Sequence, residues 1–131
     1  MALTLSPLRY PGGKTQLYDF VNHTININKL HNVTYCEPFS GGAGLAISLL
    51  LKNSVNSIIL NDFDISVYSI WHAILNDTST LIKKINCTPI TIDEWKKQKK
   101  IYESHASINS KYCIELAFAT LFLNRTNRAG I

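Results

Sequence analysis

Alternating runs of apolar and polar residues predict a compact unit in the first half of the chain. A short apolar run before Pro38 predicts a buried strand, and Ile58–Leu60 predicts a second one. Between them, residues 45–51 are almost wholly apolar and predict a helix that follows a glycine-rich turn at residues 39–44. Because parallel strands need such a crossover connection, the pattern predicts one parallel βαβ unit.

Further helices are predicted on both sides of this unit. Residues 22–32 are polar and rich in asparagine, which indicates a connection, and residues 104–110 indicate a polar loop. On the helix that follows the second strand, Tyr68, Trp71 and Leu75 share one face, and we expect this face to lie toward a core. The predicted helices cover residues 15–21, 65–75, 81–85, 92–102 and 113–123.

A change in composition at residues 86–89, from apolar to basic, predicts a boundary. Thr91 and Glu94 have the spacing of a capping box, so a helix should begin there. The later segment 113–123 is apolar on almost all sides, which is typical of a helix buried among others. We therefore divide the chain at this boundary, into residues 1–85 and 86–131.

Composition narrows the class of protein. With 131 residues, 46% apolar and 17% charged, the chain is one domain or a fragment of a larger one, and it should bury a core. The sequence has no stretch of about 20 uninterrupted apolar residues, so we expect no membrane span. Residues 1–10 lack the apolar region of a secretory signal. The three cysteines are widely spaced, which predicts a reducing, cytoplasmic setting without a disulfide framework or zinc site.

The glycine-rich turn has the chemistry of a cofactor loop. Gly41, Gly42 and Gly44 permit positive φ angles and let backbone N–H groups approach a ligand, and a helix N-terminus favours an anionic group. Asp62 follows the second strand, where dinucleotide-binding folds place an acid on the ribose hydroxyls. The glycines are too closely spaced for G-x-G-x-x-G, so a simple tight connection stays an alternative.

A second glycine motif lies near the N-terminus, at residues 9–15. Gly12 and Gly13 predict a turn, and Lys14 follows it. A P-loop would need a glycine at position 8, where this chain has Leu8, so we reject that interpretation. A turn lysine is commonly a solvated charge, but its occurrence together with the glycine loop makes it a candidate ligand-binding residue.

Basic residues in the last third of the chain are candidates for contact with nucleic acid. The net charge is +4, which is compatible with such a partner but common among proteins. The predicted helix from residue 92 carries lysines around most of its surface, and these either form a solvated face or neutralise phosphates. Asn, Arg and Thr follow the apolar helix at residues 124–128, a combination suited to DNA backbone and base-edge contacts. The lysines in question are Lys96, Lys97, Lys99 and Lys100.

With these motifs in hand, the chain resembles the Dam-like (D12-class) DNA adenine-N6 methyltransferases over residues 9–131. Arg9–Lys14 resembles the N-terminal cofactor motif of that family, and Glu37–Gly44 resembles its glycine loop, with Asn61–Asp62 ending the next strand. Residues 122–131 resemble the stretch that leads into the target-recognition region. Each motif is weak alone, but three in family order make a strong signal.

The resemblance implies an α/β fold: part of a Rossmann-like, S-adenosylmethionine-dependent methyltransferase domain, followed by the helical start of a target-recognition domain. It implies S-adenosylmethionine as cofactor and double-stranded DNA as partner, with no metal ion and no membrane. The expected cofactor-binding residues are Tyr10, Lys14, Glu37, Pro38, Phe39, Ser40, Gly41, Gly42, Gly44 and Asp62. The expected DNA-binding residues are Lys96, Lys97, Asn124, Arg125, Asn127 and Arg128.

One family feature has no counterpart in this sequence. The family's catalytic motif is Asp-Pro-Pro-Tyr or a close variant, whereas none of the four prolines here are adjacent. We therefore expect no catalytic residue in this chain, which reads as an N-terminal portion that is inactive without a C-terminal fragment. The alternatives are a non-catalytic DNA-binding remnant or subunit and a nicotinamide-dependent oxidoreductase.

Overall fold

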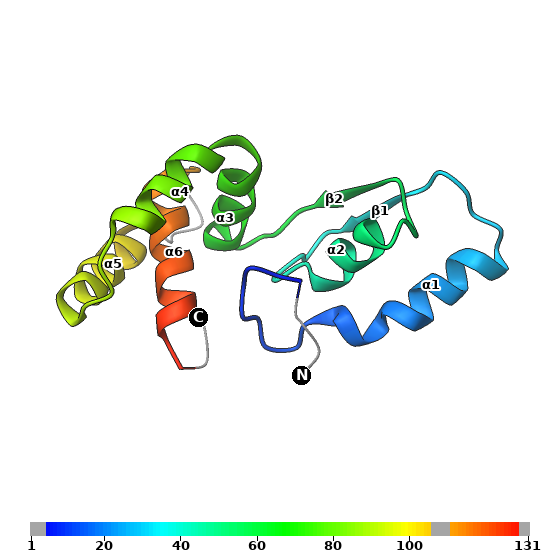
Figure 1. Cartoon of the computed structure of the whole chain (residues 1–131), viewed down its shortest axis with the longest axis horizontal. Coiled ribbons are helices and arrows are strands. Elements are labelled where there is room, and N and C mark those ends of the chain that lie inside the picture. The colour runs from blue at the N-terminus through cyan, green and yellow to red at the C-terminus, as the bar shows by residue number, and fades with distance from the viewer. Residues whose placement is uncertain (1–4, 106–110, 129–131) are drawn as a thin grey trace. The chain divides into compact units, whose positions relative to one another are not determined.

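The computed structural model describes residues 5–105 and 111–128, and Figure 1 shows the course of the chain. By the contacts between its residues, the chain divides into two compact units, residues 1–61 and 62–131. The first unit holds the 3₁₀ helix η1 (Lys14–Leu17), α1 (Tyr18–Ile27), β1 (Thr34–Glu37), α2 (Gly44–Leu51) and β2 (Ser57–Leu60). The second holds α3 (Ile65–Asn76), α4 (Thr78–Cys87), α5 (Ile92–His105) and α6 (Ile114–Thr126).

The predicted βαβ unit is confirmed. β1 and β2 pair in parallel, with Thr34 opposite Ser57 and Glu37 opposite Leu60, and α2 forms the crossover between them (Figure 1). The core of this unit is built by Leu45 and Leu49 of α2 together with apolar residues from the neighbouring segments. One side of the sheet thus rests on α2, whereas Ile59 on the other side is 55% exposed.

The α/β class therefore holds as a mixture of helices with a small parallel sheet, and the described residues contain two strands of it. Parallel sheets in complete α/β domains are covered on both faces. The exposed side of β1 and β2 also carries Cys36.

The polar connection predicted for residues 22–32 is wrong in its first half, because α1 continues to Ile27. The asparagines concealed a helical stripe in which Tyr18, Val21 and Ile25 pack against the core of the first unit. Asn28 then ends the helix, and its side-chain amide donates to the carbonyl oxygen of Thr24 at 2.8 Å. Tertiary packing has here overridden a weak local propensity.

In the second unit, α6 packs against α3, α4 and α5. Its predicted burial is confirmed: Ala117, Phe118 and Phe122 join Ala73 and Leu81 in one apolar cluster. The face predicted for α3 is wrong in part. Trp71 is 8% exposed and belongs to the core, but Leu75 is 72% exposed.

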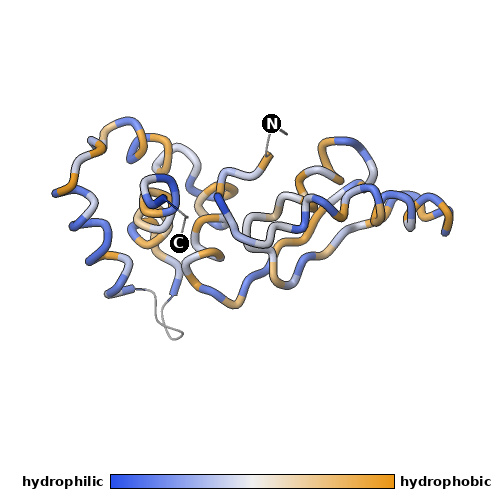
Figure 2. The backbone as a smooth tube through the Cα atoms, turned by 90° about the horizontal axis from the view of Figure 1, so that it is seen from below, coloured by the Kyte–Doolittle hydropathy of each residue, from blue (hydrophilic) through white to orange (hydrophobic). Residues whose placement is uncertain are grey.

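The basic helix α5 begins as predicted, since the backbone N–H of Glu94 donates to Oγ1 of Thr91. In Figure 2, α5 is the coil that leads into the grey internal loop and not into either grey terminus, and it is mostly hydrophilic. The polar loop predicted for residues 104–110 begins within α5, and residues 106–110 lie outside the described residues. The boundary predicted after residue 85 falls within α4 (Thr78–Cys87). The division of the chain into a cofactor-binding part and a target-recognition part stays a prediction.

No helix among the described residues has both the length and the apolar character needed to cross a membrane.

The core of the first unit yields a stability prediction from two leucines of the same helix. Leu49 is fully buried, whereas Leu51 is 62% exposed. Leu49→Ala should lower the free energy of unfolding by about 2–5 kcal/mol because it removes buried methyl groups and leaves a cavity. Leu51→Ala should change it by less than about 0.5 kcal/mol. Urea denaturation followed by circular dichroism measures both, and equal losses would contradict the predicted core.

Candidate functional site

The two glycine motifs lie against each other in the first unit. A Cβ atom added at Gly41 would lie 2.8 Å from Cε1 of Tyr10, so the tyrosine ring covers the glycine turn. A Cβ atom at Gly44 would collide with Oγ1 of Thr15. The N-terminal segment therefore reaches the turn so closely that a side chain has no room at these positions.

The three glycines of the turn differ in backbone conformation. Gly41 has a positive φ of 47°, but the second left-handed residue of the turn is Ala43, with a φ of 48°, and not Gly42 or Gly44. A tight bond from the backbone N–H of Ala43 to the carbonyl oxygen of Ser40, at 2.7 Å, closes the turn. Of the three glycines that permit positive φ, only Gly41 adopts it, whereas Gly42 and Gly44 lie where a side chain would crowd its neighbours.

Lys14 connects the two motifs electrostatically. Its Nζ donates to the carbonyl oxygen of Phe39 at 2.6 Å and lies 3.6 Å from Oε1 of Glu37. The lysine side chain is 41% exposed, so the ammonium group stands at the surface beside the turn. One of its three donors is used by Phe39, which leaves donors for another acceptor.

Glu37 is the buried partner in this pair. It is 2% exposed, and neither carboxylate oxygen has a donor in regular hydrogen-bond geometry within the described residues, although the Lys14 ammonium group and the Tyr35 hydroxyl lie near enough to favour its ionised form. Burial raises the pKa of Glu37 above its ordinary value, and the nearby Lys14 ammonium opposes that rise. Burial, with the charge of Glu37 second, likewise raises the pKa of the Tyr35 hydroxyl on the same strand. A buried acceptor without a donor is costly, so this carboxylate has unused binding capacity.

Asn61, which the sequence prediction did not include in the site, holds the turn in place. Its backbone N–H donates to the carbonyl oxygen of Glu37 at 3.0 Å, and its side-chain amide donates to that of Pro38 at 3.0 Å. The backbone N–H of Ser40 donates in return to the carbonyl oxygen of Asn61 at 2.9 Å. An asparagine directly after a strand is the only signal in the sequence that points to this role.

The other predicted cofactor residues differ in exposure. Phe39 is 69% exposed and Pro38 is also at the surface, whereas Ser40 is buried. Asp62 directly follows Asn61 and is the first residue of the second unit. Its Oδ1 accepts from the backbone N–H of Asp64 at 3.0 Å. The ribose contact predicted for Asp62 stays a prediction.

The predicted DNA-binding residues all lie in the second unit. Lys96 and Lys97 are exposed on α5, and Arg125 and Arg128 are exposed at the end of α6 and just beyond it. Asn124 is only 3% exposed, and this burial does not favour its predicted contact with DNA.

Asn127, directly after α6, is partly buried, and its Oδ1 accepts from Nε1 of Trp95 at 2.8 Å. The contact between Trp95 and Asn127 was not predicted from the sequence.

Metal ligands do not gather in the part of the chain that the structure describes: no three His, Cys, Asp or Glu side chains lie close enough together to hold an ion.

The comparison with known proteins gives the family of this chain. Residues 10–131 match the model of the D12 class N6 adenine-specific DNA methyltransferases. The chain belongs to this family, which confirms the resemblance seen in its motifs.

Among curated relatives, the chain is similar to the type II methyltransferase M.MjaIII of Methanocaldococcus jannaschii, with 26% identity over 138 aligned residues. The match covers 95% of this chain and 46% of that relative, so the chain spans about half the length of the protein it matches.

The close approach of Thr15 to Gly44 yields a prediction with a matched control. Gly44→Ala should lower the free energy of unfolding by about 1–3 kcal/mol, because the added methyl group meets the threonine hydroxyl. At Gly13 the nearest atom to an added Cβ is the carbonyl oxygen of Tyr10 at 3.5 Å, an ordinary contact, so Gly13→Ala should change little. The double variant Gly44→Ala/Thr15→Ala should regain part of the free energy of unfolding that Gly44→Ala alone loses. Urea denaturation tests this, and additive effects would refute the contact.

Burial of Glu37 predicts a pH dependence of stability. Because its pKa in the folded chain lies above the ordinary 4.5, the folded state binds the proton more tightly than the unfolded state does. The resulting stability is fully present below the ordinary pKa and is lost as the pH rises through the raised pKa. Glu37→Gln should abolish this loss, so the variant gains stability relative to the unmodified chain between about pH 4 and about pH 8. Urea denaturation at both pH values measures it. Asp19→Asn, an exposed control, should show no comparable gain.

Proposed function

We propose that this chain is the cofactor-binding portion of a DNA adenine-N6 methyltransferase that uses S-adenosylmethionine as methyl donor. The observation that carries the proposal is the pair formed by Lys14 and Glu37 beside the glycine turn. Family membership supports the reaction class.

The pair is complementary to the amino-acid end of S-adenosylmethionine, which carries a carboxylate and an ammonium group. Lys14 has donors left for the carboxylate after its bond to Phe39. Glu37 has carboxylate oxygens without donors, which an ammonium group would satisfy. The residues present therefore fit the cofactor, and each member of the pair would bind the group of opposite charge.

Further contacts follow from the other predicted residues. The exposed ring of Phe39 and the half-exposed ring of Tyr10 offer apolar surface beside the turn. The backbone of Ser40–Gly44 would approach the cofactor without side chains in the way, and Asp62 would accept from the ribose hydroxyls. The bound cofactor supplies an electrophilic methyl group, whereas the residues of this chain hold and orient it.

DNA is the proposed second partner. Exposed Lys96, Lys97, Arg125 and Arg128 would contact phosphates of the duplex, and the target adenine would be taken out of the base stack for reaction. The groups that hold the adenine amine are not among the residues of this sequence, because it has no adjacent prolines. We therefore assign methyl transfer to the protein completed by a C-terminal fragment.

The same proposal includes a Rossmann-like fold and a location in the cytoplasm. The βαβ unit fits a Rossmann-like sheet that further strands extend, with residues 1–85 serving the cofactor and residues 86–131 opening the target-recognition region. The free cysteines Cys36, Cys87 and Cys113 fit a reducing cytoplasm.

Calorimetry with S-adenosylhomocysteine, the product of the cofactor, tests the proposal. The unmodified chain should bind it more tightly than NAD. Lys14→Gln should weaken binding by about 1.5–3 kcal/mol, the usual contribution of a hydrogen bond to a charged group. Lys29→Gln, an exposed lysine of the same unit, is the matched control and should bind normally. Tighter binding of NAD, or no effect of Lys14→Gln, would overturn the assignment.

A further inference from the structure

The contact between Trp95 and Asn127 joins two segments that both carry predicted DNA-binding residues. Trp95 lies in the first turn of α5, directly before Lys96 and Lys97. Asn127 follows α6 and stands between Arg125 and Arg128. The indole Nε1 donates to Oδ1 of Asn127 at 2.8 Å across 32 residues of sequence.

Asn127 is held from two sides. Its backbone N–H donates to the carbonyl oxygen of Leu123 at 2.8 Å, which ends α6, and the chain then turns into an extended conformation with ψ of 148°. The bond from Trp95 fixes the side chain of the same residue. One lone pair of the Asn127 side-chain oxygen is therefore used by the indole, at the residue where the chain leaves the helix.

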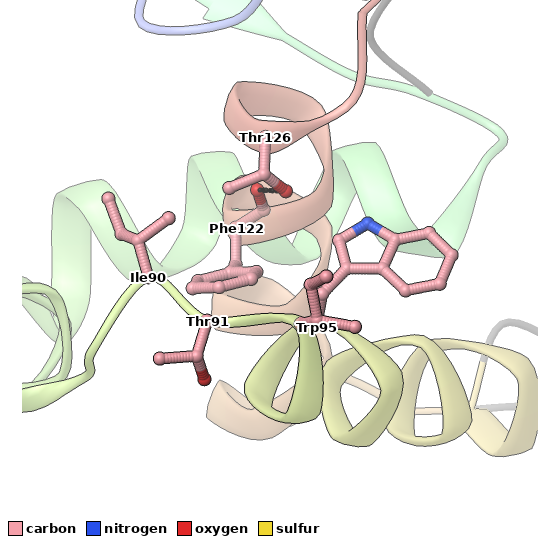
Figure 3. A pocket seen from close by; sticks show the side chains of 6 residues that line it. Ile90, Thr91, Trp95, Phe122 and Thr126 are labelled. Atoms are coloured by element: carbon pink, nitrogen blue, oxygen red, sulfur yellow. Dashed lines mark hydrogen bonds between the residues drawn. The ribbon is translucent and has the colours of Figure 1, made fainter.

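The indole ring of Trp95 is only partly buried. On one side it contacts the apolar cluster of the second unit. On another side lies an open hollow of about 220 Å³, in which the ring of Trp95 is part of the wall. Figure 3 shows the indole extending from α5 alongside α6, with Phe122 and Thr126 on the facing helix. The Lys99 ammonium group lies 5.4 Å from the centroid of the indole ring, and the bond to Asn127 is the directional contact of the indole N–H group.

We propose that Trp95 is a positioning residue for DNA binding: through Asn127 it holds the segment after α6 so that Arg128 acts together with Arg125, in the last turn of α6, and with Lys96 and Lys97. This inference rests on the proposed contact of the second unit with DNA. It gives Asn127 a different task from base readout, because the oxygen that would accept from a base is bound to the indole. In this proposal the duplex is recognised by its phosphates, through four cations whose relative positions depend on the packing of α5 against α6 and on this hydrogen bond.

Trp95→Phe tests the inference, since it keeps an aromatic ring and removes the N–H donor. Fluorescence anisotropy with a labelled mixed-sequence duplex measures the dissociation constant over a series of salt concentrations. We expect the variant to bind about two- to tenfold more weakly, the effect of one net hydrogen bond. The slope of log affinity against log salt should become shallower by about one for each phosphate that the variant no longer neutralises.

The salt slope separates positioning from a general structural defect. A partly unfolded variant would contain less competent protein, but the competent fraction would keep the unmodified slope. Asn127→Leu removes the acceptor and should reproduce the effect of Trp95→Phe. The double variant should bind no more weakly than either single variant, because both changes remove the same bond. Trp71→Phe, the same substitution in the core of this unit, should leave the slope unchanged.

The outcomes distinguish this inference from the proposed function. Salt-dependent binding by the unmodified chain, with an unchanged slope and affinity in Trp95→Phe, overturns the role of Trp95 and leaves DNA binding intact. Absence of binding by the unmodified chain at low salt overturns the DNA contact and the role of Trp95 with it.

Discussion

The first unit depends on the contact between its N-terminal segment and the glycine turn. Lys14 donates to Phe39, 25 residues further along the chain, and stands 3.6 Å from the carboxylate of Glu37. The turn has no room for side chains where Tyr10 and Thr15 meet it, so the N-terminal segment shapes the turn as much as the glycines do. Burying Glu37 without a hydrogen-bond donor is unfavourable for folding, and the nearby ammonium group offsets only part of that cost. In the proposed function, the ammonium group of the cofactor would offset a further part of this cost.

The second unit carries basic side chains on a group of packed helices. Helix α6 is apolar on nearly every side and packs against the three other helices of the unit. The buried residues of α6 hold this helix in the core of the unit, and the basic residues Arg125 and Arg128 lie at its C-terminal end and just beyond it. Long lysine and arginine side chains are flexible by themselves. The surface proposed to contact DNA phosphates therefore needs a fixed backbone, and the bond from Trp95 to Asn127 joins the two segments that carry its cations.

Local patterns in the sequence were sufficient for the parallel βαβ unit and for the buried α6, because both follow from periodicity of apolar residues over short distances. Local patterns were insufficient wherever a residue far away in the sequence determines the local conformation or contact. The extent of α1 depends on Ile25 packing into the core, which asparagine-rich neighbours concealed. Glycine spacing could not show that Gly42 and Gly44 are required for space, since Tyr10 and Thr15 create that requirement from another segment. The bond from Trp95 to Asn127 spans 32 residues and leaves no periodic signal. The roles of Asp62 and of the basic residues stay predictions.

The approach of Thr15 to Gly44 also has a consequence for how this protein can evolve. A larger residue at position 44 is less costly once position 15 has become smaller, so the order of two substitutions matters. Threonine at position 15 therefore favours glycine at position 44, whichever ligand the turn serves. Random mutagenesis of either motif alone would therefore underestimate the number of sequences that this turn can accept. Mutant libraries should vary positions 15 and 44 together.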